Sequence, residues 1–134
     1  MTTSILPSDL NSILFGLERF ISDSLARQGD VAGARRYAGF AANRRDAMCR
    51  HLWNTELGAF DDFDWQAGSL RNVASAAAAA ALFFGLADAQ QARATAQLIQ
   101  SKLLAPGGLL TTAQTSKLQW DSPNGWAPLQ WIAY

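Results

Sequence analysis

Apolar residues recur at helical spacing through the first part of the chain. Between Pro7 and Gly29, positions three or four residues apart carry large apolar side chains: Leu10, Ile13, Leu14, Leu17, Phe20, Ile21 and Leu25. This spacing predicts an amphipathic helix, and Pro7 and Ser8 suit its start as Gly29 suits its end. Asp30 is placed to cap a second helix that runs to about Trp53. The pattern therefore begins with two helices joined by a short turn.

The period changes between Leu57 and Asn72. The stretch GAFDDFDWQAGSLR alternates aromatic and acidic residues and then reaches a turn of small residues at 67–69. Such a pattern predicts a short β-hairpin or an extended loop that carries aromatic side chains. Apolar, alanine-rich sequence follows and predicts a third helix over about 73–87 and a fourth over about 89–103.

The last part of the chain is less regular. LLAPGGLLTTAQTS is expected to be irregular or strand-like, because Pro106, Gly107 and Gly108 interrupt it. A final helix is predicted to begin near Trp126 or Ala127, where Pro128 suits a first turn. No internal domain boundary is visible. Two pairs of helices with an intervening hairpin fit either part of a toroid of helical hairpins or a small helical bundle, and periodicity alone leaves both open.

Composition removes several classes of function. Lys plus Arg and Asp plus Glu both number 11, so the formal net charge is zero and gives no electrostatic basis for binding nucleic acid or an anionic membrane surface. The apolar run at 73–87 is shorter than the roughly 20 residues that a membrane span needs, which favours a buried helix. The N-terminal MTTSILPSDLN has no signal-peptide pattern. Charged residues make up only 16% of the chain, which suggests surface buried against a partner chain or further sequence.

For most clusters of polar residues, the sequence pattern favours a structural role over a catalytic or metal-binding one. The acidic trio does not match a calcium loop, because the sixth residue from Asp62 is Ala67 and the twelfth is Val73. Turn and capping chemistry on a solvent-exposed rim is the expected role of the three aspartates: Asp61, Asp62 and Asp64. His51 has no neighbours with ligand spacing, and Cys49 is expected to be a small buried side chain. No metal and no cofactor are predicted.

The stretch LQWDSPNGWAPLQW, residues 118–131, is different. Three tryptophans at positions 120, 126 and 131 lie among Asp121 and Asn124. Flat apolar faces beside hydrogen-bonding groups suit a sugar ring, which has an apolar C–H face and a rim of hydroxyls. Two prolines restrict the backbone, and Gly125 allows a tight bend between them. An aromatic loop that plugs a helical bundle would explain the same composition.

The motif QWDSPNGWAP, residues 119–128, resembles the second signature of the trehalases, glycoside hydrolases that split α,α-trehalose into two glucoses. Further segments are similar to those of the family and follow in the family's order: PSDLNSILF, LWN, GAFDDFD and APGGLLTT. The resemblance covers essentially all 134 residues. Lys117-Leu118 replaces the family's usual Gly-Gln pair, and Ser8 stands where a Val is common.

The resemblance implies an all-α fold, the (α/α)6 toroid, of which residues 1–134 would be a single incomplete segment with about four to five helices and one short hairpin or extended loop. It also implies an inverting mechanism with an Asp acid and a Glu base. The family's acid lies upstream of the part that matches 3–11, and its base lies downstream of the Gln-Trp-Asp motif. No residue of this sequence is therefore assigned as catalytic, and the isolated chain is expected to be inactive.

The resemblance implies one wall of a sugar site. Trp120 is expected to stack on a glucose ring, and Asp121 to orient the loop or bind a hydroxyl. The loop's supporting residues would be Gln119, Asn124 and Trp126. Two alternatives stay open: a non-catalytic helical module that binds a sugar or a partner protein, and another six-hairpin glycosidase with a different substrate. Exposed apolar helix faces would favour self-association. The compartment is undetermined, because trehalases of bacteria are periplasmic or cytoplasmic.

Overall fold

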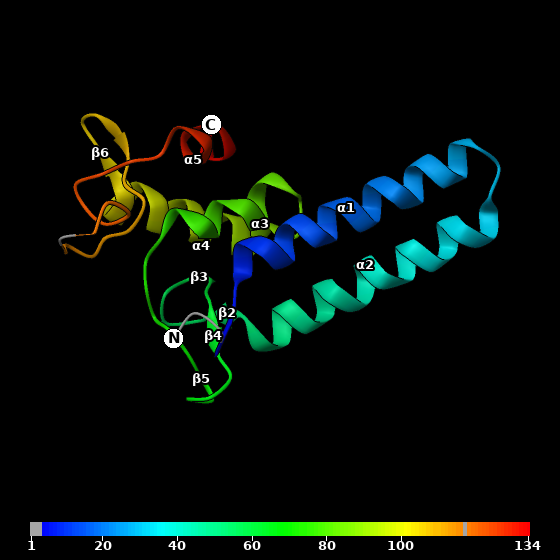
Figure 1. Ribbon diagram of the computed structural model, residues 1–134, viewed down its shortest axis with the longest axis horizontal. Coiled ribbons are helices and arrows are strands. Elements are labelled where there is room, and N and C mark those ends of the chain that lie inside the picture. Colours follow the sequence, from blue (N-terminus) through cyan, green and yellow to red (C-terminus); the bar gives the residue numbers. More distant parts are fainter. Residues whose placement is uncertain (1–3, 117) are drawn as a thin grey trace.

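A long antiparallel helical hairpin projects from a body of shorter elements in the computed structural model, which describes residues 4–116 and 118–134 (Figure 1). The hairpin consists of α1 (Ser8–Arg27) and α2 (Val31–His51), and both predicted helices are confirmed. Pro7 precedes α1 in an extended conformation, and Gly29 ends the hairpin's turn with a φ of 83°. The Asp30 carboxylate accepts the N–H of Gly33 at 2.9 Å, which is the predicted cap of α2.

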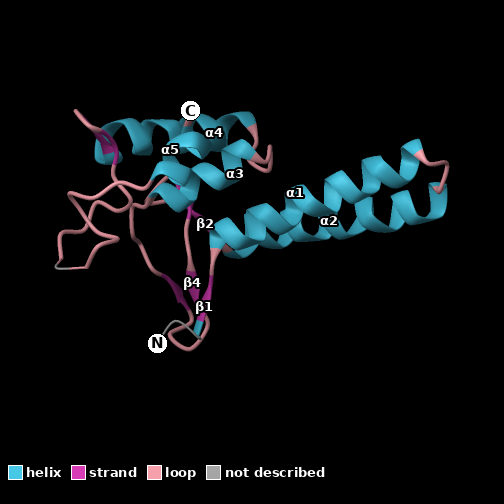
Figure 2. Ribbon diagram, turned by 45° about the horizontal axis from the view of Figure 1, so that its top comes forward, coloured by secondary structure: helices cyan, strands magenta, loops and turns pink. Residues whose placement is uncertain are grey.

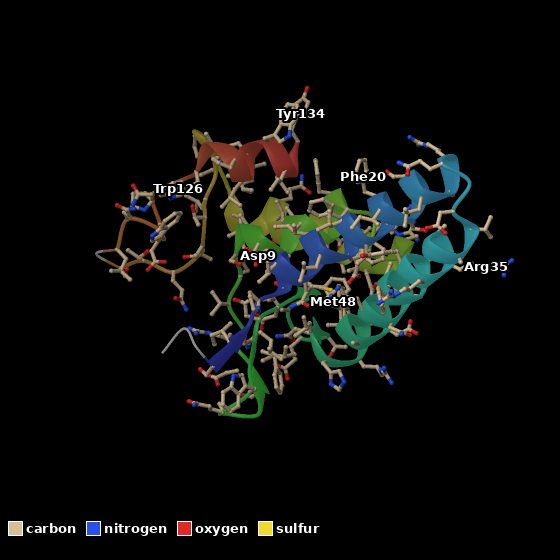
Figure 3. The ribbon with its side chains drawn as sticks, turned by 45° about the vertical axis from the view of Figure 1, so that its right-hand side comes forward. Asp9, Phe20, Arg35, Met48, Trp126 and Tyr134 are labelled. Atoms are coloured by element: carbon tan, nitrogen blue, oxygen red, sulfur yellow. The ribbon has the colours of Figure 1, made fainter. Side chains whose placement is uncertain are left out.

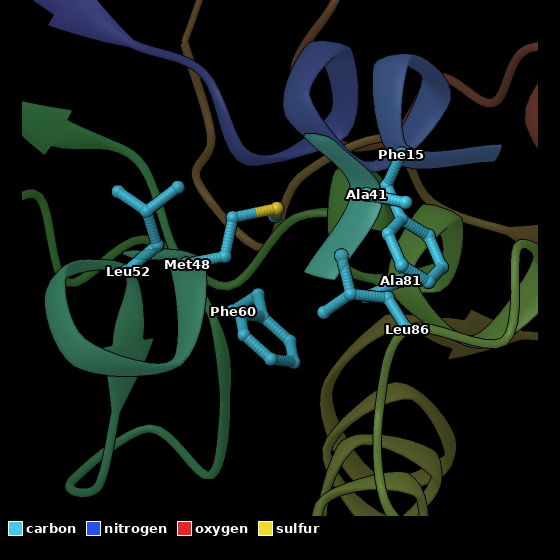
Figure 4. Packing of buried hydrophobic residues seen from close by; sticks show 7 residues of the cluster. All are labelled: Phe15, Ala41, Met48, Leu52, Phe60, Ala81 and Leu86. Carbon is cyan, nitrogen blue, oxygen red and sulfur yellow. The ribbon is translucent and has the colours of Figure 1, made fainter. Parts of the chain in front are cut away.

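The hydrophobic core lies where this hairpin meets the body (Figure 4). Its main cluster joins α1, α2, the strand that ends at Phe60, and the segment around α3 (Ala79–Phe83). The buried members are Phe15, Ala41, Met48, Leu52, Phe60, Ala81 and Leu86. The ring of Trp53 packs edge-on against that of Phe60, with centroids 5.1 Å apart. Cys49 is half-buried and packs against this cluster.

More short strands are present than the short hairpin or extended loop that the sequence predicts between 57 and 72. β2 (Trp53–Asn54) pairs with β3 (Ala59–Phe60), and β4 (Phe63–Asp64) lies between β1 (Ile5–Leu6) and β5 (Ser69–Leu70), all antiparallel. β4 and β5 form a short hairpin within 57–72, as predicted, whereas the pairing of β2 with β3 and of β1 with β4 was not expected. Strands of two residues carry almost no periodic signal, and β1 comes from a distant part of the sequence.

The third helix is much shorter than the predicted 73–87. The chain is extended through Ser75, continues as a 3-10 turn, η2 (Ala76–Ala78), and then forms α3. Alanine favours helix locally, but the backbone of Ser75 pairs with Thr112, and the N–H of Ala76 donates to the carbonyl of Thr111 at 2.9 Å. Pairing with the later segment thus overrides the local preference, and Gly85, with a φ of 67°, follows the end of the helix.

The remaining elements follow the predicted order. α4 (Ala89–Leu98) begins with a capping box of Asp88 and Gln91 and passes into a π-helical turn, η3 (Ile99–Leu103). β6 (Leu104–Ala105) and β7 (Gly108–Leu109) form a hairpin, and α5 (Ala127–Ala133) has a proline in its first turn, as predicted. Figure 2 shows α3, α4 and α5 grouped together, with β1 and β4 away from them. Among the described residues, no helix is both long and apolar enough to cross a membrane.

Candidate functional site

A cleft of about 890 Å³ opens between three segments that are distant in the sequence. Its walls come from residues 5–9 at the start of α1, from residues 61–77, and from the C-terminal segment 111–129. Trp120, Asp121 and Trp126 all line it. The fold therefore brings the motif that the sequence singled out to the wall of a cavity.

Two tryptophans form a stacked pair in this wall. The rings of Trp120 and Trp126 lie 3.7 Å apart between centroids and are inclined by only 10°. Trp126 lies on the C-terminal loop just before α5 (Figure 3). Trp120 is 50% exposed, and Trp131, on α5, is 73% exposed. The alternative of an aromatic loop buried inside a helical bundle is therefore wrong, because half of the Trp120 surface remains available to solvent while Trp126 supports the ring.

Asp121 connects the two sides of this loop. Its carboxylate accepts hydrogen bonds from the hydroxyl of Thr112, at 3.1 Å, and from the hydroxyl of Ser116. Its carbonyl accepts the backbone N–H and the side-chain amide of Asn124, at 3.0 and 3.1 Å. Gln119 is exposed in the same turn. The carboxylate of Asp121 is thus occupied by the protein itself, a geometry that suits orientation of the loop.

The loop is fastened to the body by a residue that the sequence did not indicate. The Gln130 side chain accepts the N–H of Leu109 at 2.7 Å and donates to the carbonyl of Leu109 at 2.6 Å. An added Cβ on Gly125 would lie 2.6 Å from that same carbonyl oxygen. Glycine is therefore required here by the close approach of two backbones, rather than by the tight bend that we expected. No local pattern marks Gln130, because its partner lies 21 positions away.

The acidic trio has a different role at each position. Asp61 is only 4% exposed, so its predicted place on a solvent rim is wrong. It accepts the N–H of Asn72 at 2.6 Å and the side-chain amide of Asn54 at 3.2 Å. Asp62 accepts both the N–H and the hydroxyl of Ser8, at 2.8 and 3.1 Å, and so caps the first turn of α1. Asp61 thus ties residue 61 to residues 54 and 72, while Asp62 fastens this segment to the start of α1, and both carboxylates line the cleft.

The other polar candidates lie outside the cleft. Asp64 accepts the N–H groups of Ala67 and Gln66 in the turn between β4 and β5, and these bonds, that of Ala67 first, lower the pKa of its carboxyl. His51 is exposed as the last residue of α2, where a structural role was predicted. Within the described part of the chain, no three or more His, Cys, Asp or Glu side chains are grouped so that they could hold a metal ion.

Comparison with known proteins identifies the family to which this chain is related. The family model described as Trehalase matches residues 1–134. The chain belongs to the trehalase family. The structure of neutral trehalase Nth1 from Saccharomyces cerevisiae superposes with a TM-score of 0.87 at 28% identity, over 97% of this chain and 27% of that chain. The match confirms the predicted fold class, a mostly helical part of an α/α toroid.

Curated trehalases are more similar in sequence. The periplasmic trehalase of Xanthomonas campestris pv. campestris (strain B100) is 49% identical over 132 residues, which are 98% of this chain and 23% of the relative. That of Salmonella agona (strain SL483) is 45% identical over the same shares of both chains. This trehalase-family chain thus spans about a quarter of the length of the curated relatives it matches.

Proposed function

We propose that this chain is a single segment of a trehalase catalytic domain and supplies one wall of the site that binds trehalose. The stacked pair of Trp120 and Trp126 carries the proposal, because it presents a half-exposed indole face to the cleft. The relatives are named as trehalases, so the disaccharide trehalose is the ligand that the family favours. A glucose ring would place its apolar C–H face on Trp120 and its hydroxyls against the polar groups of the cleft.

The neighbouring residues would hold this face in place. Trp126 backs the ring of Trp120, and Asp121 ties the loop to Thr112 and Ser116. Asn124 braces the turn through the carbonyl of Asp121. Gln119 lies beside Trp120, and its part in supporting the loop stays a prediction. A loop braced by several hydrogen bonds keeps an aromatic face oriented before a ligand arrives, which is the requirement of a preorganised site.

Hydrolysis is not expected of the isolated chain. An inverting glycosidase needs an acid and a base about 6.5–9.5 Å apart on opposite sides of the bond that breaks. Three of the carboxylates that line the cleft, Asp61, Asp62 and Asp121, are already engaged by the protein's own donors. The purified chain should therefore release no glucose from trehalose in a coupled glucose assay. Glucose release that disappears in the Trp120→Ala variant would contradict this proposal.

A free-standing sugar-binding module is the second candidate, favoured by the presence of a cleft of about 890 Å³ within this chain. Affinity separates the two candidates. A wall that covers one side of a disaccharide should bind trehalose with a Kd on the order of 1 mM, because small-molecule sites gain affinity by enclosing most of the ligand. A dedicated module should bind it in the micromolar range, without hydrolysis.

We also propose that the chain self-associates through an apolar stripe on α1. The α1 stripe consists of residues on one face of the helix that are 44–66% exposed: Leu10, Ile13, Leu17 and Phe20. Their spacing of three or four residues makes the apolar surface continuous. A second copy of the chain presents the same stripe and is the simplest partner to cover it.

We expect sedimentation equilibrium to detect dimers or larger oligomers whose proportion rises with protein concentration. The double variant Leu17→Glu and Phe20→Glu should shift the chain to monomer, because close packing of two stripes would bury the added charges without partners. The Gln100→Glu variant adds a charge at an exposed position in η3 and should leave the oligomers unchanged. A wild-type chain that stays monomeric over the whole concentration range would refute self-association.

A further inference from the structure

The charged residues of the cleft differ in how far the fold already uses them. Among the described residues, five charged side chains line it: Asp9, Asp61, Asp62, Arg71 and Asp121. The carboxylates of Asp61, Asp62 and Asp121 accept hydrogen bonds from backbone or side-chain donors of the protein. They hold segments of the cleft together and have less capacity to bind a ligand.

Asp9 and Arg71 are different. In the first turn of α1, one carboxylate oxygen of Asp9 accepts the N–H of Leu10 at 2.6 Å, and its second oxygen has no hydrogen-bond partner in the described part of the chain. The backbone N–H of Arg71 donates to the carbonyl of Asp62 at 2.9 Å. Its guanidinium, in contrast, is exposed and forms neither a hydrogen bond nor an ion pair with any described residue. Both backbones are fixed while both head groups remain available.

We propose that Asp9 and Arg71 form a polar edge that binds hydroxyl groups of the sugar seated on Trp120; this inference rests on the function proposed above. A carboxylate accepts hydrogen bonds from hydroxyls, and a guanidinium donates to their oxygens. Asp9 lies on α1 and Trp126 on the C-terminal loop (Figure 3), so polar and aromatic groups would reach the ligand from separate elements. Four carboxylates and one guanidinium line the cleft, so its charge is negative on balance. This charge favours a neutral sugar over an anionic one.

The test is a trehalose titration of the 134-residue chain, followed by NMR, with variants of each member of the edge. Asp9→Asn retains an acceptor for the Leu10 N–H, and Arg71→Gln removes the charge while keeping a polar side chain. Each should weaken trehalose binding by roughly tenfold or more, because hydrogen bonds to charged groups are among the stronger ones. Arg71→Lys keeps a charged donor and should retain more affinity than Arg71→Gln.

Matched controls make the same chemical changes outside the cleft. Asp46 on α2 and Arg93 on α4 are both exposed, so Asp46→Asn and Arg93→Gln should bind trehalose as the wild-type chain does. Thermal unfolding followed by circular dichroism verifies that all variants are folded. A response that depends on Trp120 but is unchanged in Asp9→Asn and Arg71→Gln would overturn the polar edge and leave the proposed function standing. Equal losses in the controls would also overturn it, and a wild-type chain without any response would overturn both proposals.

Discussion

Replacement of Trp120 by alanine should abolish the measurable response of the chain to trehalose. The substitution removes the half-exposed ring that stacks on Trp126 and lines the cleft. Covering about 60 Å² of apolar surface is worth about 1.5 kcal/mol, or roughly a tenfold change in affinity. Since the wild-type Kd is expected on the order of 1 mM, a tenfold loss places binding near the limit of detection. Saturation-transfer NMR, observed on the sugar protons, measures this loss directly.

A tryptophan outside the cleft provides the control. Trp65 is also exposed but lies at the β4–β5 turn, and it is not among the residues that line the cleft. The Trp65→Ala variant should therefore keep the full saturation-transfer signal. A Trp120→Phe variant retains a smaller aromatic face and should give an intermediate signal. If Trp120→Ala and Trp65→Ala bind trehalose equally well, the stacked pair is not the binding wall.

Of the variants proposed for this chain, Phe60→Ala should lower the free energy of unfolding most. Phe60 is 2% exposed, contacts the Trp53 ring and belongs to the main core cluster (Figure 4). Truncating such a ring costs about 3–5 kcal/mol, because the cavity left behind closes only in part. This loss is a large share of the roughly 5–15 kcal/mol that stabilises a typical domain. Urea denaturation followed by circular dichroism should show a much lower midpoint, or no folded baseline.

Replacing a more exposed phenylalanine by alanine provides the control for Phe60→Ala. Phe83, the last residue of α3, is exposed and contacts the ring of Phe84 edge-on at 5.0 Å. The Phe83→Ala variant should lose about 1 kcal/mol, the value of one aromatic pair. Similar losses of unfolding free energy in both variants would contradict the position of the core. Because Phe60 immediately precedes Asp61, the Phe60→Ala variant should also loosen residues 61–72 and weaken sugar binding.

The sequence predicts well those features that depend on neighbours in the chain. The spacing of apolar residues in α1, the Asp30 cap and the proline in the first turn of α5 are all local signals, and each is found in the structure. The Gln-Trp-Asp motif also identified the loop that lines the cleft, because its resemblance to the trehalases extends over contiguous residues.

Features that depend on distant partners were not predictable in this way. The alanine run at 76–81 favours a long helix, yet Ser75 just before it is held extended by pairing with Thr112, and the N–H of Ala76 donates to Thr111. The buried position of Asp61 depends on Asn54 and Asn72. Arg71 lies in none of the segments that resemble the trehalases, and Asp9 has no role assigned to it within PSDLNSILF. The two residues line the same cleft only because three separate segments enclose it. The sequence could therefore indicate the aromatic side of the proposed site but not its proposed polar side.

The most direct test of the proposed sugar-binding wall is an NMR titration of the wild-type chain, whose tryptophans are labelled with ¹⁵N at the indole. The indole N–H signals of Trp53, Trp65, Trp120, Trp126 and Trp131 can be assigned by single Trp→Phe variants and followed as trehalose is added. We expect saturable shifts at Trp120 and Trp126, with Trp53 and Trp65 unchanged, because the sugar would contact Trp120 and Trp126 stacks directly on that ring. Unchanged signals from Trp120 and Trp126 in excess trehalose, or shifts confined to the other tryptophans, would contradict a sugar-binding wall built on Trp120.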